Sequence, residues 1–66
     1  MKITINGKEK IFSDNTTICD MLAQMNFESK KTLVLLNDQI IENEAWQKHT
    51  LKEGDSIEII SFVEGG

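Results

Sequence analysis

The chain has 66 residues, of which eleven are acidic and seven basic, so its net charge is −4, and it contains no arginine. A chain this short buries only about 60% of the surface it exposes when unfolded, which limits it to one small domain with little room for a deep catalytic cavity. Phosphate backbones and anionic membranes attract clustered positive charge, so the charge balance argues against both as partners. We expect a single domain over residues 1–66 with a flexible tail over residues 63–66.

The carboxylates are concentrated in the second half of the chain. After Asn37 there are seven acidic residues and two lysines: Asp38, Glu42, Glu44, Glu53, Asp55, Glu58 and Glu64 against Lys48 and Lys52. This asymmetry fits a basic docking surface on a partner, and a solvated face explains it almost as well. One cysteine cannot form an internal disulfide, and no segment reads as a membrane span or a signal peptide, so we expect a cytoplasmic protein that is monomeric when free.

The first half predicts a hairpin followed by a helix. Residues 2–6 alternate polar and β-branched side chains, which predicts a strand with Ile3 and Ile5 facing the core. Asn6-Gly7 predicts a type I′ turn into a second strand over residues 8–12. Thr17 followed by Asp20 resembles a capping box, and apolar residues at helical spacing continue from Ile18 to Met25.

The second half predicts more strands. Residues 32–36 form a continuous apolar run, so both faces of this strand are covered or one face meets a partner. Asn37-Asp38 predicts a turn into a short strand over residues 39–42, and Trp46 and Leu51 should pin an irregular stretch to the core. A turn at residues 52–55 precedes the last strand over residues 56–62. The predicted fold class is α+β, with a mixed four- to five-stranded sheet packed on one short helix.

The chain ends on Gly65-Gly66, preceded by Val63 and Glu64. Without β-carbons near the terminal carboxylate, such a tail can lie extended in a narrow channel and admit an attacking group from either side. The pattern suits chemistry performed on the carboxylate by other enzymes. A flexible terminus without a role is the alternative.

Alternation in the last strand predicts a docking surface beside the tail. If every second residue faces the core, Ile60 and Phe62 point outward. A similar argument places Leu33 and Leu35 inside and Val34 outside. We expect Val34, Ile60 and Phe62 to form an exposed apolar patch, since such clusters often mark interfaces. The alternative is a bend near the end of the strand that returns Ile60 or Phe62 to the core.

The other reactive side chains favour ordinary structural roles. Cys19 is a lone cysteine early in a helix and is expected to be a small buried hydrophobe. His49 is the only histidine and lacks partners at metal-ligand spacing, so no metal site is predicted. Glu42 and Glu44 lie two residues apart, as paired acids on solvated loops often do. We predict no catalytic residues.

The order of these features resembles the ubiquitin-like sulfur carriers of the β-grasp fold, most closely the ThiS family. The resemblance spans the whole chain and rests on residues 3–7, residues 36–41, Trp46, residues 51–59 and Gly65-Gly66. It implies that Gly66 is adenylated by an E1-like adenylyltransferase of the ThiF type, which uses ATP and Mg²⁺, and is then converted to a thiocarboxylate.

The same resemblance implies the remaining partners. Sulfur would come from cysteine through a donor such as a cysteine desulfurase, and a thiazole synthase of the ThiG type would receive it for the thiazole ring of thiamine. The carrier itself would be no enzyme and would hold no cofactor. Carriers for molybdopterin synthesis, tRNA thiolation or protein conjugation remain alternatives, as does a plain β-grasp interaction module.

Overall fold

A single mixed sheet with one α-helix against it makes up the described part of the chain. The computed structural model describes residues 1–62. Within them lie five strands in the spatial order β2-β1-β5-β3-β4. Their bounds are β1 Lys2–Ile5, β2 Lys8–Ile11, β3 Thr32–Leu36, β4 Gln39–Ile40 and β5 Ser56–Ser61, with the helix α1 over Ile18–Gln24. Two short 3₁₀ helices, η1 (Ser29–Lys31) and η2 (Asn43–Ala45), lie in the connections. No helix of this described part is long and apolar enough to span a bilayer.

The β1–β2 hairpin forms as predicted. Asn6 and Gly7 adopt φ values of 50° and 83°, both in the left-handed region that a type I′ turn requires. The register pairs Ile5 with Lys8 and Ile3 with Lys10. Ile3 and Ile5 are buried in the core, whereas all of β2 is exposed. β2 is an edge strand whose charged side chains disfavour pairing with a strand of another molecule.

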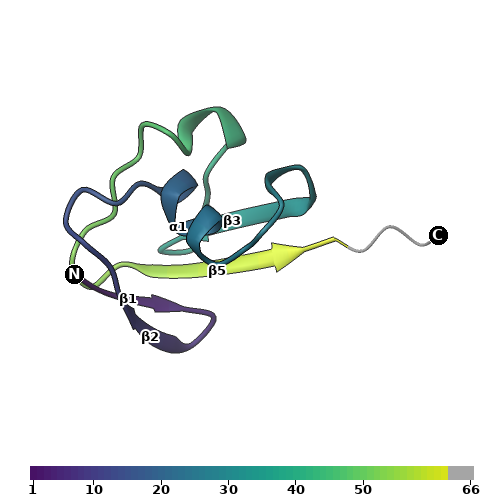
Figure 1. The fold of residues 1–66 in the computed structure, drawn as a ribbon. Coiled ribbons are helices and arrows are strands. Elements are labelled where there is room, and N and C mark those ends of the chain that lie inside the picture. The colour runs from purple at the N-terminus through teal and green to yellow at the C-terminus, as the bar shows by residue number, and fades with distance from the viewer. Residues whose placement is uncertain (63–66) are drawn as a thin grey trace.

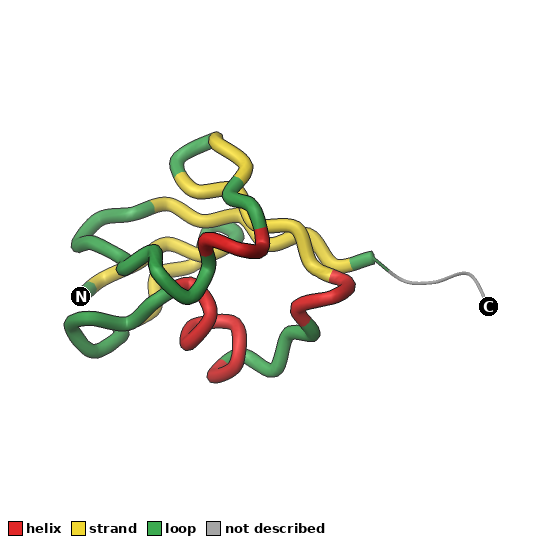
Figure 2. The backbone as a smooth tube through the Cα atoms, turned by 90° about the horizontal axis from the view of Figure 1, so that it is seen from above, coloured by secondary structure: helices red, strands yellow, loops and turns green. Residues whose placement is uncertain are grey.

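The capping box at the start of α1 is confirmed. The Thr17 hydroxyl accepts from the Asp20 amide at 3.1 Å, and the Asp20 carboxylate accepts from the Thr17 amide at 3.3 Å. The helix turns Ile18, Met21 and Leu22 into the core and leaves its other side to solvent. Seven residues are too few for a stable isolated helix, so this apolar face against the sheet must supply most of its stability. Figure 1 shows α1 on one side of the sheet, and in the perpendicular view of Figure 2 α1 and η1 lie on the same side of the strands.

Trp46 and Leu51 pin the long connection between β4 and β5, as predicted. Both side chains are buried in the core cluster. The Trp46 indole Nε1–H also donates to the Ile41 carbonyl at 2.9 Å, which satisfies its one polar group. Because both side chains reach the same core as the apolar face of α1, they hold this irregular segment against it.

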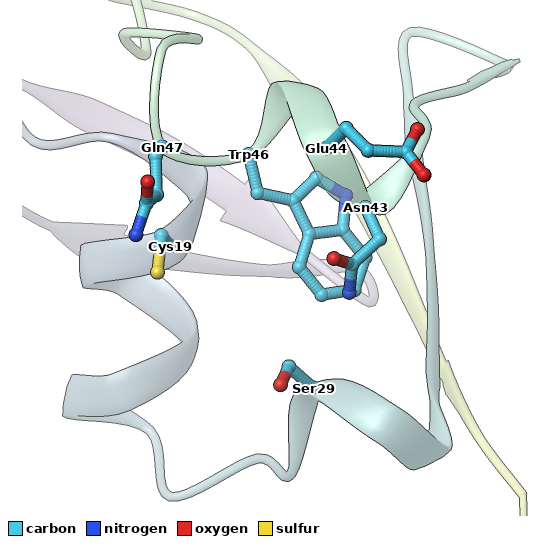
Figure 3. A pocket seen from close by; sticks show the side chains of 6 residues that line it. All are labelled: Cys19, Ser29, Asn43, Glu44, Trp46 and Gln47. Atoms are coloured by element: carbon cyan, nitrogen blue, oxygen red, sulfur yellow. The ribbon is translucent and has the colours of Figure 1, made fainter.

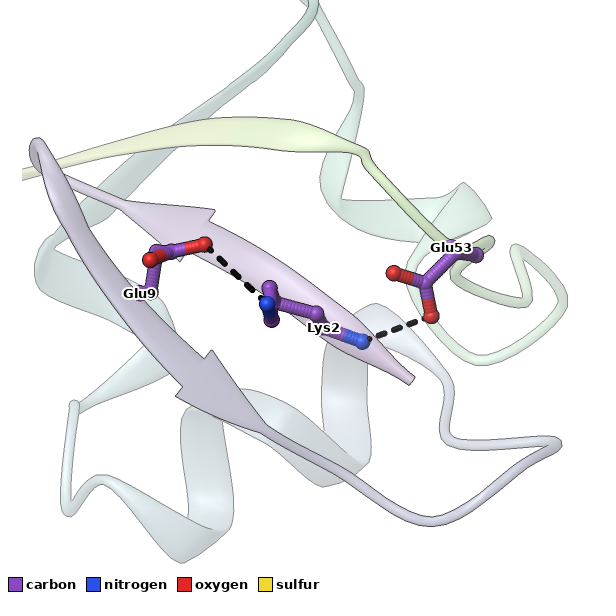
Figure 4. Close-up of polar contacts among 3 residues, drawn as sticks. All are labelled: Lys2, Glu9 and Glu53. Carbon is purple, nitrogen blue, oxygen red and sulfur yellow. Dashed lines mark hydrogen bonds and ion pairs between the residues drawn. The ribbon is translucent and has the colours of Figure 1, made fainter.

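β5 lies at the centre of the sheet, parallel to β1 and antiparallel to β3. Its start is tied to β1 by the preceding turn, where the Glu53 carboxylate accepts from the Lys2 amide at 2.9 Å (Figure 4). The Gly54 amide also donates to the Lys2 carbonyl at 2.9 Å. The Lys2–Glu9 ion pair beside it, at 3.8 Å, is exposed and contributes little to stability. From this anchored start, β5 runs across the molecule to the end opposite the N-terminus (Figure 1).

The orientation predicted for the third strand is wrong. Val34 is 0% exposed and belongs to the core, whereas Leu33 and Leu35 are only partly buried. The β3–β5 register places Val34 opposite Ile59, and opposed residues of an antiparallel pair share a face of the sheet. Ile59 faces the core, so Val34 must face it too. Val34 is therefore excluded from any exposed docking surface.

Candidate functional site

The end of β5 carries exposed apolar side chains, as predicted. Ile60 is 43% exposed and Phe62 is 55% exposed, whereas Ile57 and Ile59 are buried. The Phe62 amide donates to the Lys31 carbonyl at 2.7 Å, so the β3–β5 pairing continues one residue past the strand and the chain does not bend back over the core. Buried and exposed residues alternate up to Ile60, after which Ser61 and Phe62 are both exposed.

The outer face of the sheet, opposite α1, collects further apolar residues around Ile60. Leu33 lies directly opposite Ile60, and Leu35 lies opposite both Glu58 and Ile40. Because paired residues share a face, these side chains join Ile60 on the outer side. We define the outer patch as Leu33, Leu35, Ile40, Ile60 and Phe62. It extends over β4, β3 and the end of β5.

Sequence reasoning missed Leu33, Leu35 and Ile40 as members of this patch. The signal that could have found them is the pairing itself, because a single exposed residue on β5 fixes which residues of its neighbour are exposed. Ile40 is 58% exposed on a two-residue edge strand, where nothing in the described fold covers it. Patches of this kind commonly mark protein interfaces.

A shallow groove of about 320 Å³ adjoins the patch at the end of β5. Its lining comes from the end of β5 and from the segment that leads into β3: Ser61 and Phe62, and Asn26, Phe27, Glu28, Lys31 and Thr32. Lys31 lies 3.8 Å from the Glu28 carboxylate, and both are exposed. The groove therefore presents two aromatic rings, Phe27 and Phe62, and the Lys31 ammonium group next to the last described residue.

The predicted tail residues Val63, Glu64, Gly65 and Gly66 lie outside the described residues. Of the three predicted docking residues, Ile60 and Phe62 are exposed and Val34 is buried. The roles of Ile60 and Phe62 in docking stay predictions.

A second hollow, of about 300 Å³, lies between α1 and η2. Cys19, Ser29, Asn43, Glu44, Trp46 and Gln47 line it, and Figure 3 shows the Cys19 thiol on α1 across from the Trp46 ring. Cys19 is half-buried and packs against the core, consistent with a small hydrophobe. Among the residues that are described, no three His, Cys, Asp or Glu side chains gather closely enough to hold a metal ion.

Comparison with known proteins identifies the family of the chain and supports its fold. The model of the ThiS family matches residues 2–66. The chain is 40% identical to the sulfur carrier protein ThiS of Bacillus subtilis over 65 residues, covering 97% of this chain and 98% of that protein. It is 26% identical to the sulfur carrier protein ThiS of Escherichia coli over the full length of both.

Longer proteins also contain a segment similar to the whole chain. A thiazole synthase of Paramagnetospirillum magneticum is 33% identical over 66 residues, and the chain spans only 20% of that protein. Among solved structures, the thiamine biosynthesis protein ThiS of Geobacter metallireducens superposes with a TM-score of 0.85 at 29% identity, covering 100% of both chains. The expected β-grasp fold is thereby confirmed, and the chain belongs to the ThiS family.

Proposed function

We propose that this chain is a sulfur carrier protein that serves thiamine biosynthesis through the carboxylate of Gly66. The observation that carries the proposal is the match to the ThiS family, which runs through the terminal Gly65-Gly66. Two relatives to which the chain is similar over nearly their full length are named sulfur carrier protein ThiS. The outer patch at the end of β5 supports the same reading, because it provides a docking surface close to where the tail begins.

The proposed chemistry takes place on the carboxylate and is performed by partner enzymes. A free carboxylate is a poor acyl donor because oxide cannot leave. An activating enzyme of the ThiF type joins the Gly66 carboxylate to the α-phosphorus of ATP with Mg²⁺ present, and pyrophosphate leaves. A cysteine desulfurase takes sulfur from cysteine as a persulfide, whose terminal sulfur attacks the acyl carbon while AMP leaves. A thiol such as excess cysteine then attacks the donor sulfur of the resulting acyl disulfide, so that the thiocarboxylate leaves and the thiol and the donor are joined in a disulfide. Glycine at the reacting carbon keeps the approach open.

A thiazole synthase is the proposed acceptor of the sulfur. The similarity of the whole chain to part of two proteins named thiazole synthase supports this choice, because domains found in one polypeptide often act on each other's products. The chain itself contributes docking and reach. It is proposed to turn over no substrate and to hold no cofactor of its own.

Intact-protein mass spectrometry tests the proposal. Incubation with an activating enzyme of the ThiF type, ATP, Mg²⁺, cysteine and a cysteine desulfurase should exchange one oxygen for sulfur, and fragmentation should place the change at Gly66. Omission of ATP should leave the mass unchanged. A variant lacking Gly66 should fold normally and remain unmodified. An unmodified full-length chain, under conditions in which the Bacillus subtilis carrier is loaded, would contradict the proposal.

A further inference from the structure

The backbone partner of β5 on its β1 side ends before β5 does. The last β1 residue in the ladder, Ile5, lies beside Ile57, and the Asn6 amide donates to the Ile57 carbonyl at 2.9 Å. β5 continues to Ser61. The amide and carbonyl of Ile59 point to the side where β1 has already turned away into its hairpin with β2.

Beyond the end of β1, the side chain of Asn6 supplies the hydrogen bonds that a neighbouring strand would make to β5. Its Oδ1 accepts from the Ile59 amide at 2.8 Å, and its Nδ2 donates to the Ile59 carbonyl at 3.3 Å. A carboxamide has the same donor and acceptor as a peptide group, so Asn6 pairs with Ile59 as a further residue of β1 would. We call this pair of bonds the Asn6 clamp.

The turn alone does not require this side chain. Asn6 has φ = 50°, a conformation that glycine adopts at least as readily as asparagine. A glycine would therefore form the same type I′ turn without reaching β5. The Asn6 side-chain amide is therefore not needed for the hairpin turn. Its two hydrogen bonds hold Ile59 instead.

Ile59 is the last residue of β5 that is held from both sides. Beyond it, Ile60 pairs with Leu33 and Ser61 with Thr32, all on the β3 side. The described chain then ends at Phe62, three residues after the clamp. On the β3 side the chain is held as far as Phe62, whose amide donates to the Lys31 carbonyl. The direction in which the chain leaves the sheet therefore depends on the β3 ladder on one side and on the Asn6 clamp on the other.

We propose that Asn6 is a positioning residue for sulfur loading: its amide fixes the end of β5 and so aligns the tail for attack at Gly66. This inference rests on the proposed function. A loosened clamp leaves the outer patch available for docking but widens the range of directions in which β5 and Phe62 point. Misalignment of a reacting group lowers the rate of the chemical step more than it lowers binding.

Asn6→Gly is the variant that isolates the clamp, because it keeps the turn and removes both bonds to Ile59. The matched control is Asn37→Gly, because the side chain of Asn37 bonds to the start of β5 as that of Asn6 bonds near its end. Asn37 also has a positive φ, of 49°, and its Oδ1 accepts from the Ser56 amide at 3.0 Å, while its Nδ2 donates to Asp55 at 3.4 Å. Both variants thus remove a side-chain clamp on β5 from a left-handed turn position, but only Asn6 lies at the tail end.

Steady-state loading by the activating enzyme, with the carrier as the varied substrate, gives the decisive comparison. Asn6→Gly should lower kcat about tenfold with little change in KM, since docking is retained and alignment is lost. Asn37→Gly should leave both constants within about twofold of wild type. Equal losses in the two variants, or no loss in Asn6→Gly, would overturn the inference while the proposed function stands. A wild-type chain that is not loaded at all would overturn the proposed function and the inference with it.

Hydrogen exchange by NMR provides a measurement that does not depend on activity. In the folded Asn6→Gly variant, the Ile59 amide should exchange faster than in wild type, and the Val34 amide on β3 should not. Should Asn6→Gly fail to fold, Asn6→Asp keeps the turn and the acceptor for the Ile59 amide but loses the donor to its carbonyl, and a reduced kcat is expected again. An Ile59 amide that exchanges as fast in wild type as in either variant would show that the clamp does not hold the strand.

Discussion

Leu33 lies directly opposite Ile60 across the β3–β5 ladder, on the face of the sheet that α1 does not cover. One strand comes from the middle of the chain and the other leads into its carboxyl end. Their pairing brings apolar side chains from both beside the start of the tail. We expect a partner that acts on the Gly66 carboxylate to dock on the outer patch.

A charge placed in the outer patch should weaken docking without unfolding the protein. Ile60→Asp removes a half-exposed apolar side chain and introduces a carboxylate that must be desolvated on binding. We expect the Kd for the activating enzyme to rise at least about tenfold, as at the centre of an interface. Isothermal titration calorimetry measures the affinity, and circular dichroism checks the fold.

Ile11→Asp is the matched control for that prediction. Ile11 is 73% exposed and lies opposite Lys2, which places it on the same face but on the edge strand β2, two strands away from β5. Its substitution should leave the Kd within about twofold of wild type. If Ile11→Asp weakened binding as much as Ile60→Asp, the effect would come from charge alone and not from the outer patch.

Truncation of Val34 should affect stability and not docking. Val34 is fully buried in the core, so Val34→Ala should lower the free energy of unfolding by about 2 kcal/mol through lost apolar contact and a residual cavity. Urea unfolding followed by Trp46 fluorescence measures this. Leu33→Ala removes a larger side chain from the outer face, and should cost less stability but more affinity. The reverse ranking in either measurement would contradict the assigned orientation of β3.

Local signals in the sequence predicted most of the fold. Asn6-Gly7 and the Thr17–Asp20 capping box each specify a backbone conformation over a few residues, and both appear as predicted. The alternation in β5 also predicted correctly that Ile57 and Ile59 are buried and that Ile60 is exposed. These signals succeed because the physical cause lies within one short segment.

The orientation of β3 was not accessible in the same way. Its residues Leu33, Val34, Leu35 and Leu36 are all apolar, so the run contains no alternation that distinguishes one face from the other. The choice is made by pairing with β5, a segment more than twenty residues later. The Asn6 clamp was hidden for the same reason, since its partner Ile59 lies 53 residues away.

The capping box should contribute measurably to a domain with such a short helix. Thr17→Ala leaves the Asp20 amide without its acceptor and should lower the free energy of unfolding by about 1 kcal/mol. Thr17→Ser retains the hydroxyl and should recover most of this loss. Urea unfolding of the three proteins checks the prediction, and an equal loss in the serine variant would assign the effect to the missing methyl group instead.

Replacement of Cys19 tests whether sulfur reaches Gly66 directly, as proposed, or passes through the Cys19 thiol first. Cys19 is the only thiol, it is half-buried, and it lines the hollow between α1 and η2. If sulfur is transferred directly to the Gly66 acyl carbon, the thiol is not needed, and Cys19→Ala should be loaded at the wild-type rate and to the same extent. Intact-protein mass spectrometry with peptide mapping measures both. Loss of loading in a folded Cys19→Ala variant, or a sulfur adduct mapped to Cys19 in the wild type before one forms at Gly66, would mean that sulfur passes through the thiol. In that case the carrier would take part in the transfer chemistry and would not act solely as its substrate.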